Sequence, residues 1–550
     1  MTGGGKANLV IVTTLNDQVF AYDAAQTQTS ANPCSSSGVP WGTWYWAKNL
    51  INDLGDCGGS AEGVPVPKPG TALPSAGVLS TPVVYVHDQV VYLVGGCENT
   101  TDSSIHWYLH GLNLADGSDK FTPIDVGKGV YVPSAGGAAG ATSGTLPFQA
   151  QYQLQRAALL LAANGDIYVA FGVANGSETA FVRYPYHGWL IGYRVTPTLN
   201  STANFAFAST PDYDSSNGTT PCSNVPNYSN TDVSNQCGLG GGIWMSGKGP
   251  AIYNAGETTY IVVGTGNGGV LAGGSLPSWG SSIVSFDLNT TCTTTSSPTQ
   301  CSPAEFYTPS NYKTLNANDQ DMGNSGVVVT DTLTGGSSQL VAFDKTGEGY
   351  VLNPGSLPGY SSSDCTNCKF QGAVTNGGTC NGAGGSNYCD IISSPVYWNS
   401  YLFLWPRAED LDGCYWNSGL FSCQPNTKIY SNDDLEPSGF PGGSLVLSAN
   451  CTNCTLSGSN AILWGIATSK AAVPYTEPDA APDNFSAKLK AYSLLTPPPQ
   501  SGTTPNFTVD EIWASPIFLG SIFAQPTVVN GSVYVPRYGL GVEVFYPTNQ

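Results

Sequence analysis

Charged residues and helix-forming tracts are scarce in this chain of 550 residues. Only 10% of the residues are Asp, Glu, Lys or Arg, and no long stretch places apolar residues at the 3.6-residue spacing of an amphipathic helix. No run of 18 apolar residues is present either, which argues against a helix that spans a bilayer. The sequence therefore does not describe a helical bundle or a helical membrane protein.

Basic residues are fewer than acidic ones. The 18 Lys and Arg residues stand against 38 Asp and Glu residues, so the formal net charge is -20. Binding to a phosphate backbone depends on clustered positive charge, and an anionic membrane surface requires the same. We therefore expect neither a nucleic acid nor a membrane as a partner.

Catalytic and metal-binding motifs are also missing. The sequence has no nucleophile elbow, no Walker loop and no glycine-rich dinucleotide motif between a strand and a helix. His106 and His110 are four residues apart, but their segment has a strand pattern and not a helical one. The acidic segments 408–413 and 431–436 are typical of solvated loops, with weak Ca²⁺ binding as the alternative.

The chain is rich in β-structure signals. Its short Val, Ile, Tyr and Phe runs are broken by Gly, Asn, Asp and Pro, as in all-β proteins. A degenerate unit recurs, in which a strand often opened by proline is followed by a second strand and by a strand of the form aliphatic-x-Ala-aromatic-Asp. The first strands of these units lie at Pro82, Ala157, Pro250, Gly326, Pro395, Gly443 and Pro526. Some units close with a fourth, aromatic strand, such as WYWAKNL at Trp46. Four short strands per unit predict one β-propeller domain over residues 1–550, with about eight, alternatively seven, four-stranded blades.

The units are longer than an ordinary blade, so we expect loop insertions at about 198–240, 355–392 and 405–440. The terminal blades, about 7–50 and 522–547, each show three strand patterns in place of four. An unpaired strand edge is a template for another strand. We therefore expect self-association into an oligomer or filament by strand exchange. The alternatives are a weak strand that the pattern misses and a clipped gene.

Fifteen cysteines are present, and most fall into close pairs within loop-like sequence. We predict loop disulfides, with zinc as the alternative for the two CTNC segments, although neither has a suitably spaced second C-x2-C. Disulfides require an oxidising compartment, so we expect an extracellular or cell-surface protein, or a periplasmic one. The start, MTGGGKANLVIVTT, lacks signal-peptide regions, so we expect an export leader to be absent from this sequence. The predicted pairs, which leave Cys97 over, are Cys34/Cys57, Cys222/Cys237, Cys292/Cys301, Cys365/Cys368, Cys380/Cys389, Cys414/Cys423 and Cys451/Cys454.

Eleven N-x-S/T triplets fit an exported protein with exposed loops. Such triplets also arise by chance in a chain rich in Asn, Ser and Thr, so glycosylation is a hypothesis. The candidate residues are Asn99, Asn175, Asn200, Asn217, Asn227, Asn289, Asn450, Asn453, Asn484, Asn506 and Asn530.

Four segments stand in chain order on the predicted blades: GGGIW at Trp244, GTGNGG at Asn267, NDQDMGNSG at Asp319 and AFDKTGEGYVLN at Lys345. With the repeats, they resemble the quinoprotein alcohol dehydrogenase family and the PQQ-like propeller proteins of bacteria. That family's eight-bladed propellers hold pyrroloquinoline quinone (PQQ) and Ca²⁺. The resemblance extends over essentially the whole chain.

The resemblance implies a role for each of the four residues. Trp244 is similar to the tryptophan under the quinone ring, and an indole face suits a planar ring. Asn267 is similar to an amide ligand of the calcium, and Asp319 stands where the family has its catalytic aspartate beside that cation. Lys345 is similar to the basic residue that touches the quinone oxygens. The resemblance thus implies PQQ, Ca²⁺ and hydride transfer from an alcohol or sugar.

The sequence also departs from the family pattern. In RYPYHGWLIGY, Arg183 stands where active members have a glutamate calcium ligand, and a cation there would repel Ca²⁺. The adjacent cysteine pair of the dehydrogenases is absent, and no C-x-x-C-H haem site occurs. A structural alternative exists for each site residue: Trp244 as packing, Asn267 as a turn, and Asp319 and Asp321 as turn caps with Lys345 paired to one of them.

We therefore expect a non-catalytic structural or binding propeller with no cofactor. The alternative is a PQQ- and Ca²⁺-dependent dehydrogenase in which Asp319 is the base. A third hypothesis is a carbohydrate-binding propeller that uses loop aromatics such as Trp405 and Trp416, because exposed tryptophans suit sugar faces.

Overall fold

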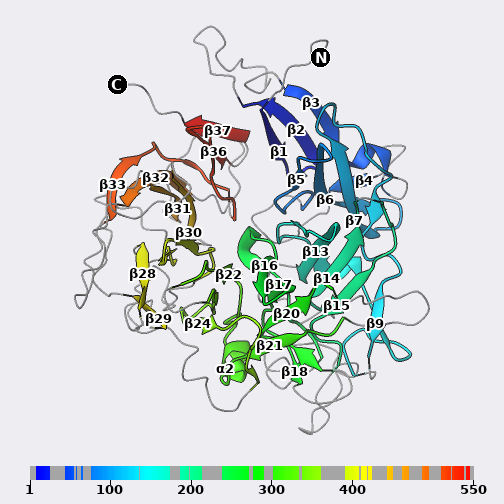
Figure 1. Cartoon of the computed structure of the whole chain (residues 1–550). Coiled ribbons are helices and arrows are strands. Elements are labelled where there is room, and N and C mark those ends of the chain that lie inside the picture. The colour runs from blue at the N-terminus through cyan, green and yellow to red at the C-terminus, as the bar shows by residue number, and fades with distance from the viewer. Residues whose placement is uncertain are drawn as a thin grey trace.

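The structure is a computed structural model of the chain, drawn in Figure 1. It describes residues 8–24, 44–54, 57, 63–65, 76–134, 137–173, 186–196, 198–212, 238–271, 277–289, 301–333, 337–360, 391–407, 411–417, 419–423, 442–449, 461–469, 486–494, 509–521, 523–537 and 541–545.

Eight sheets follow one another along the chain and are arranged around a centre (Figure 1), and their strands pair antiparallel except for one strand of blade 4. Blade 1 has β1 (Leu9–Thr13), β2 (Gln18–Asp23) and β3 (Trp44–Asn49). Blade 2 has β4 (Gly63–Pro65), β5 (Val83–Tyr85), β6 (Val90–Asn99), β7 (Ile105–Asn113) and β8 (Ile124–Asp125). Blade 3 has β11 (Gln153–Leu154), β12 (Leu160–Leu161), β13 (Asp166–Val173), β14 (Trp189–Arg194) and β15 (Phe205–Ala208). Blade 4 has β16 (Ala251–Ala255), β17 (Thr258–Gly264), β20 (Ile283–Asp287) and β21 (Glu305–Thr308), with β25 (Gly359–Tyr360) parallel to β21.

The second half of the ring repeats this plan. Blade 5 has β22 (Val328–Val329), β23 (Leu340–Phe343) and β24 (Gly349–Leu352). Blade 6 has β26 (Val396–Trp398), β27 (Tyr401–Leu404), β28 (Asp412–Asn417) and β29 (Leu420–Cys423). Blade 7 has β30 (Gly443–Ser448), β31 (Ile462–Ser469), β32 (Ser486–Leu494), β33 (Val509–Ala514) and β34 (Phe518–Leu519). Blade 8 has β35 (Thr527–Val529), β36 (Ser532–Arg537) and β37 (Gly541–Phe545).

A few short elements lie outside the blades. Two ribbons pair β9 (Tyr131–Pro133) with β10 (Thr145–Pro147) and β18 (Val270–Leu271) with β19 (Ser278–Trp279). Short helical turns are η1 (Ile51–Asp53), η2 (Ala150–Tyr152), η6 (Met245–Gly247) and α2 (Tyr312–Ala317). The all-β, eight-bladed propeller expected from the repeat is confirmed, with three to five strands per blade among the described residues.

The alternation of side chains along each strand explains how the blades pack into a ring. In β13 the side chains of Ile167, Val169 and Phe171 pack against blade 2. The intervening Tyr168 and Ala170 pack against blade 4. Successive side chains of a strand point to opposite faces of its sheet, so one strand contributes to two interfaces. A blade in this ring must therefore be apolar on both faces, which is why its strands read as continuous Val, Ile, Tyr and Phe runs.

Packing between blades also corrects one expectation from the sequence. Trp405 follows β27 and is buried, 4% exposed, between blades 6 and 7. A Cβ on Gly443 or Gly465 would lie within 2.5 Å of its indole, so these glycines make room for the ring. Trp416 is half-buried against Phe421, with ring centroids 5.2 Å apart. The expectation of an exposed aromatic is therefore wrong for Trp405, whereas Trp416 lies on β28 and stays partly exposed, so its role toward a sugar remains a hypothesis.

The terminal blades are three-stranded over the described residues, and a hydrogen bond of 3.1 Å from the Tyr534 hydroxyl to the Ala24 carbonyl joins blade 8 to blade 1. The segments expected as insertions hold blade strands as well as loops: β15 lies within 198–240, β25 within 355–392, and β28 and β29 within 405–440. In the part of the chain that is described, no helix is long and apolar enough to cross a membrane.

A disulfide links Cys57 to Cys97, with a Cα–Cα distance of 6.3 Å. The predicted pairing of Cys34 with Cys57 is therefore wrong, and so is the assignment of Cys97 as the unpaired thiol. Closeness in sequence was misleading here, because the chain that leaves blade 1 runs beside β6 of blade 2. There β4 pairs with the end of β6, and Cys57 and Cys97 share a small core with Tyr108.

The other cysteine predictions are tested only in part. Cys301 and Cys414 are each disulfide-bonded, and Cys414 lies opposite Cys423 in the ladder between β28 and β29. Cys34, Cys222, Cys237, Cys292, Cys365, Cys368, Cys380, Cys389, Cys451 and Cys454 lie outside the described residues.

Four candidate glycosylation residues lie within the described part of the chain. Asn200, Asn289 and Asn530 are exposed, and Asn99 is half-buried at the end of β6. The remaining candidates, Asn175, Asn217, Asn227, Asn450, Asn453, Asn484 and Asn506, lie outside the described residues.

Replacing Cys57 and Cys97 together by alanine should lower the free energy of unfolding by about 4 kcal/mol, because the bridge closes a loop of 40 residues. Denaturant unfolding measures the loss. Peptide mapping without reductant should recover the Cys57–Cys97 link from the wild type. Recovery of a Cys34–Cys57 peptide would contradict the structure.

Asp17 is a buried carboxyl group in the turn between β1 and β2. It is 1% exposed, and neither carboxyl oxygen has a hydrogen-bond partner among the described residues that meets ordinary geometry. The carboxyl group lies against the backbone of Gly77 and Gly95, where an added Cβ would be 2.6 and 2.7 Å from it. Burial raises the pKa of Asp17 to about 8, partly offset by the N–H of Gly96.

This raised pKa makes stability depend on pH. Between about pH 4 and pH 8 the unfolded chain ionises Asp17 while the folded chain keeps it protonated, so the free energy of unfolding falls as the pH rises. Asp17→Asn should remove that loss and gain about 2 kcal/mol at pH 8, with little change at pH 4. Denaturation across this range measures both profiles. Asp116→Asn, at an exposed turn, is the control and should show no such gain. The prediction fails if the free energy of unfolding of Asp17→Asn depends on pH in the same way as that of the wild type.

Candidate functional site near the axis

The four residues singled out by the resemblance lie on neighbouring blades. Trp244 precedes η6 and the first strand of blade 4, and Asn267 follows the second strand of that blade. Asp319 precedes the first strand of blade 5, and Lys345 follows its second strand. First strands such as β16 and β22 lie nearest the middle of the ring (Figure 1), so the segments joined to them meet close to the axis.

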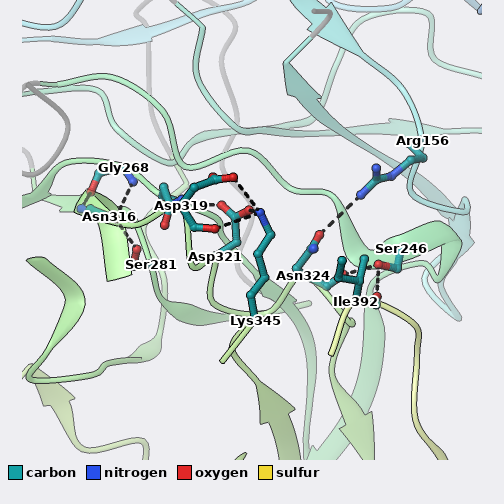
Figure 2. A network of polar contacts seen from close by, with 11 residues as sticks. Arg156, Ser246, Gly268, Ser281, Asn316, Asp319, Asp321, Asn324, Lys345 and Ile392 are labelled. Carbon is teal, nitrogen blue, oxygen red and sulfur yellow. Dashed lines mark hydrogen bonds and ion pairs between the residues drawn. The ribbon is translucent and has the colours of Figure 1, made fainter. Parts of the chain in front are cut away.

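Lys345 forms ion pairs with two carboxylates. Its Nζ lies 2.6 Å from Asp321 Oδ2 and 3.3 Å from Asp319 Oδ2, and it also donates to the main-chain carbonyl of Asp319 at 3.1 Å. Figure 2 shows the ammonium group between the two aspartates. The side chains are largely buried, with 14% exposure for Lys345, 20% for Asp319 and 9% for Asp321. The sequence suggested, as the structural alternative, that Lys345 pairs with one of the two aspartates. The structure shows that it pairs with both.

Asn267 closes the other side of this group. Its main-chain N–H donates to Asp321 Oδ1 at 2.7 Å, and its side-chain Nδ2 donates to Asp319 Oδ1 at 2.9 Å. Its Oδ1 is buried and has no hydrogen-bond partner among the described residues. Asp319 has φ +56°, a left-handed conformation that is uncommon outside glycine. Burial and the charges of Asp321 and Asp319 raise the pKa of Tyr186 well above its ordinary value, which places that tyrosine beside the same cluster.

Trp244 lies on a glycine surface and is covered by a cation. A Cβ on Gly172 would be 2.6 Å from its ring, and one on Gly242 would be 2.9 Å from its Nε1, so only glycines fit there. The guanidinium of Arg156 stands over the indole, 4.8 Å from the ring centroid. The same guanidinium lies 4.0 Å from the ring centroid of Phe523, so it is held by two aromatic rings.

Arg156 is a desolvated charge. Burial lowers its pKa to about 9, opposed by the charge of Asp321. Its Nη2 reaches Asn324 Oδ1 at 3.5 Å, as Figure 2 shows, while its Nε is buried without a partner among the described residues. Among the described residues, the guanidinium of Arg156 is therefore stabilised mainly by its contacts with the rings of Trp244 and Phe523.

A strained turn connects this group to blade 6. Met245, Ser246 and Gly247 have φ values of +46°, +45° and +81° in succession. The Ser246 hydroxyl bonds to the carbonyls of Asn324, at 2.7 Å, and Ile392 (Figure 2). Non-glycine residues in this conformation persist only where surrounding contacts hold them.

Lys248 makes a further link from the same turn. Its Nζ donates to the carbonyl of Pro395 at 2.6 Å, and burial lowers its pKa to about 8. Ser246 and Lys248, which precede blade 4, thus bind the segments that lead into blades 5 and 6 near the centre of the ring.

The residues present do not fit Ca²⁺ as they stand. A calcium site needs several oxygen ligands turned toward one point. Here the Lys345 ammonium takes up the Oδ2 atoms of both aspartates, and the other carboxylate oxygens accept from Asn267. In the described part of the chain, no group of three His, Cys, Asp or Glu residues is arranged to hold a metal. Arg183, expected to disfavour calcium, lies outside the described residues.

A planar cofactor meets a similar obstacle. The indole face of Trp244, which the resemblance assigns to the quinone, is covered by Arg156. Cys97 is bonded to Cys57 and therefore does not take part in a bridge between adjacent cysteines. Among the described residues, the groups that would contact PQQ or Ca²⁺ are thus engaged by other side chains of this chain.

Comparisons with known proteins return matches among solved structures alone. No family model and no curated protein matches the chain. Among solved structures, a quinohemoprotein alcohol dehydrogenase of Pseudomonas putida is 13% identical with a TM-score of 0.44, over 98% of this chain and 69% of that one. A europium-containing methanol dehydrogenase is 12% identical with a TM-score of 0.38, over 96% and 73% of the two chains. A quinohemoprotein alcohol dehydrogenase of Comamonas testosteroni is 14% identical with a TM-score of 0.38, over 85% and 74%. At these values no cofactor or substrate carries over.

Sequence reasoning missed two residues of this group, Arg156 and Phe523. Arg156 lies between β11 and β12 of blade 3, and Phe523 comes from the segment between blades 7 and 8. Arg156 could have been noticed in the sequence, because it is the only charged residue in the segment QLQRAALLLA. Phe523 gave no signal, because its place depends on the closure of the whole ring.

Lys345→Ala should create a cation site from the freed oxygens of Asp319 and Asp321, with the unpartnered Asn267 Oδ1 beside them. Without metal we expect the variant to lose about 3 kcal/mol of stability, because two carboxylates lose their ammonium partner. Thermal unfolding with and without millimolar Ca²⁺ should show stabilisation of the variant and not of the wild type. Lys313→Ala, at an exposed helix position, is the matched control. No calcium response in Lys345→Ala would contradict this account of the site.

Proposed function

We propose that this chain is an exported, non-catalytic β-propeller that acts as a structural or binding protein and associates with copies of itself through its terminal blades. One observation supports a non-catalytic role: the candidate cofactor-binding residues near the propeller axis interact with other side chains of this chain. Lys345 occupies Asp319 and Asp321, and Arg156 covers Trp244. An enzyme of this architecture would need those same groups directed toward a ligand.

Two further features support export. The bridge between Cys57 and Cys97, and the disulfide bonds of Cys301 and Cys414, are chemistry that persists in oxidising compartments. The exposed positions of Asn200, Asn289 and Asn530 are compatible with glycosylation outside the cell.

A PQQ- and Ca²⁺-dependent dehydrogenase is the second candidate, and one observation favours it. The buried Oδ1 of Asn267 lacks a partner among the described residues, as an unfilled ligand oxygen would. In that case Asn267 and Asp319 would hold the metal, Trp244 and Lys345 would contact the quinone, and the quinone would accept the hydride. Lys345 and Arg156 would both have to move first.

Titration with PQQ in millimolar Ca²⁺, followed by tryptophan fluorescence and quinone absorbance, separates the two candidates. We expect no saturable binding by the wild type, because Arg156 stands over Trp244. Arg156→Ala, which uncovers the indole, tests whether that cation is the obstacle. Micromolar binding by the wild type that is lost in Trp244→Ala would overturn the non-catalytic proposal and make the dehydrogenase the better account.

A further inference from the structure

The outer rim of blades 7 and 8 exposes apolar side chains. Ile512 and Trp513, adjacent residues of β33, are 54% and 40% exposed. A register shift opposite Ala491 and Tyr492 breaks the alternation of β33, so both residues reach solvent. The Trp513 ring contacts that of Phe545 on β37, with centroids 5.4 Å apart. We call Ile512, Trp513, Phe545 and the edge of β37 the rim patch.

The outer strands of blades 3 and 4 are covered, in contrast to the rim patch. All four residues of β15 are buried, and β9 lies against that strand. In blade 4, β25 pairs with the outer side of β21. Among the described residues, no strand covers β37 in this way, and its pairing is to β36. An added strand at this edge would satisfy the main chain and shield the aromatic side chains at once.

The β37 edge is able to accept a strand. Pro536, opposite Val542, has no N–H to donate across the ladder. The main-chain groups of Val542 and Val544 are therefore the ones directed away from β36. β37 contains no proline and no lysine, the residues that often blunt a sheet edge.

Charge at the rim patch favours a copy of this chain as the occupant. Two molecules of net charge -20 repel one another over most of their surfaces. Two acidic side chains described at the rim patch are already paired, Glu543 with Arg537 at 3.1 Å and Glu511 with Lys490 at 3.2 Å. Contact through these described residues thus brings apolar surface together, and the charges of Glu543 and Glu511 are already balanced within each copy.

We propose that a second copy of this chain docks on the rim patch by antiparallel pairing of β37 with its own β37. A two-fold contact applies the same patch twice, and antiparallel pairing of one strand with its copy has that symmetry. The two three-stranded blades then form one continuous sheet, with Ile512 and Trp513 of each copy beside the joint. This inference rests on the proposed self-association and adds its site and geometry.

The test is the mass of the full-length chain in solution, by sedimentation and light scattering over a concentration series. We expect a concentration-dependent dimer. Ile512→Glu should weaken it about tenfold or more, because it places a charge in the apolar contact. Val544→Pro should also weaken it, because proline removes an outward N–H while leaving the ladder to β36 intact. Val86→Glu, at a residue 68% exposed on blade 2, is the matched control and should not change the dimer.

The outcomes separate the two proposals. A wild type that stays monomeric throughout the series overturns self-association altogether. A dimer that survives in both rim variants, with unchanged thermal unfolding of each, overturns the rim patch and leaves self-association standing. A monomer that binds a synthetic strand peptide at β37 would show that the occupant is a different protein, which also overturns this inference.

Discussion

Face-to-face packing of neighbouring blades is the interaction on which the rest of this structure depends. Each sheet is sandwiched by two others, so β13 sends alternate side chains into two different cores. Burial of each large aliphatic or aromatic side chain contributes roughly 1.5–3 kcal/mol. The helices among the described residues are single short turns that add little to this core. Glycines such as Gly443 and Gly465 follow from the same demand, because Trp405 fits between sheets only where they lack a Cβ.

This packing brings polar groups together at the axis, where strands from several blades begin. Buried charges there must be met by partners, and this chain supplies them itself: an ammonium between two carboxylates, and a guanidinium between two aromatic rings. A cofactor or metal could provide the same compensation. Lys345 and a metal ion would compete for the carboxylate oxygens of Asp319 and Asp321, and Arg156 and a planar cofactor would compete for the face of Trp244. The positions of Lys345 and Arg156 therefore decide whether either ligand can bind.

Much of the fold could be predicted from the sequence, because the repeat places equivalent strands at recognisable motifs; the first strands at Pro82, Pro250 and Pro395 precede β5, β16 and β26 as expected. The proximity of Asn267, Asp319 and Lys345 also followed, since they occupy related positions on adjacent blades. Contacts between distant segments did not follow. Cys57 meets Cys97 because blade 1 leads the chain along β6, and Phe523 meets Arg156 only once the ring is closed. Such contacts are set by three-dimensional packing that local patterns do not encode.

The same demand for two covered faces has a further consequence at the rim. Inner strands are covered by their neighbours automatically, whereas an outer strand is covered only if the chain supplies a ribbon or an extra strand, as β9 and β25 do for blades 3 and 4. Where that cover is lacking, an apolar outer strand gains by meeting another molecule. Ile512, Trp513 and the edge of β37 are in that situation while the axial charges are satisfied internally. Among the described residues, the rim thus combines an uncovered strand edge with exposed apolar side chains, and the proposed contact between copies would cover both.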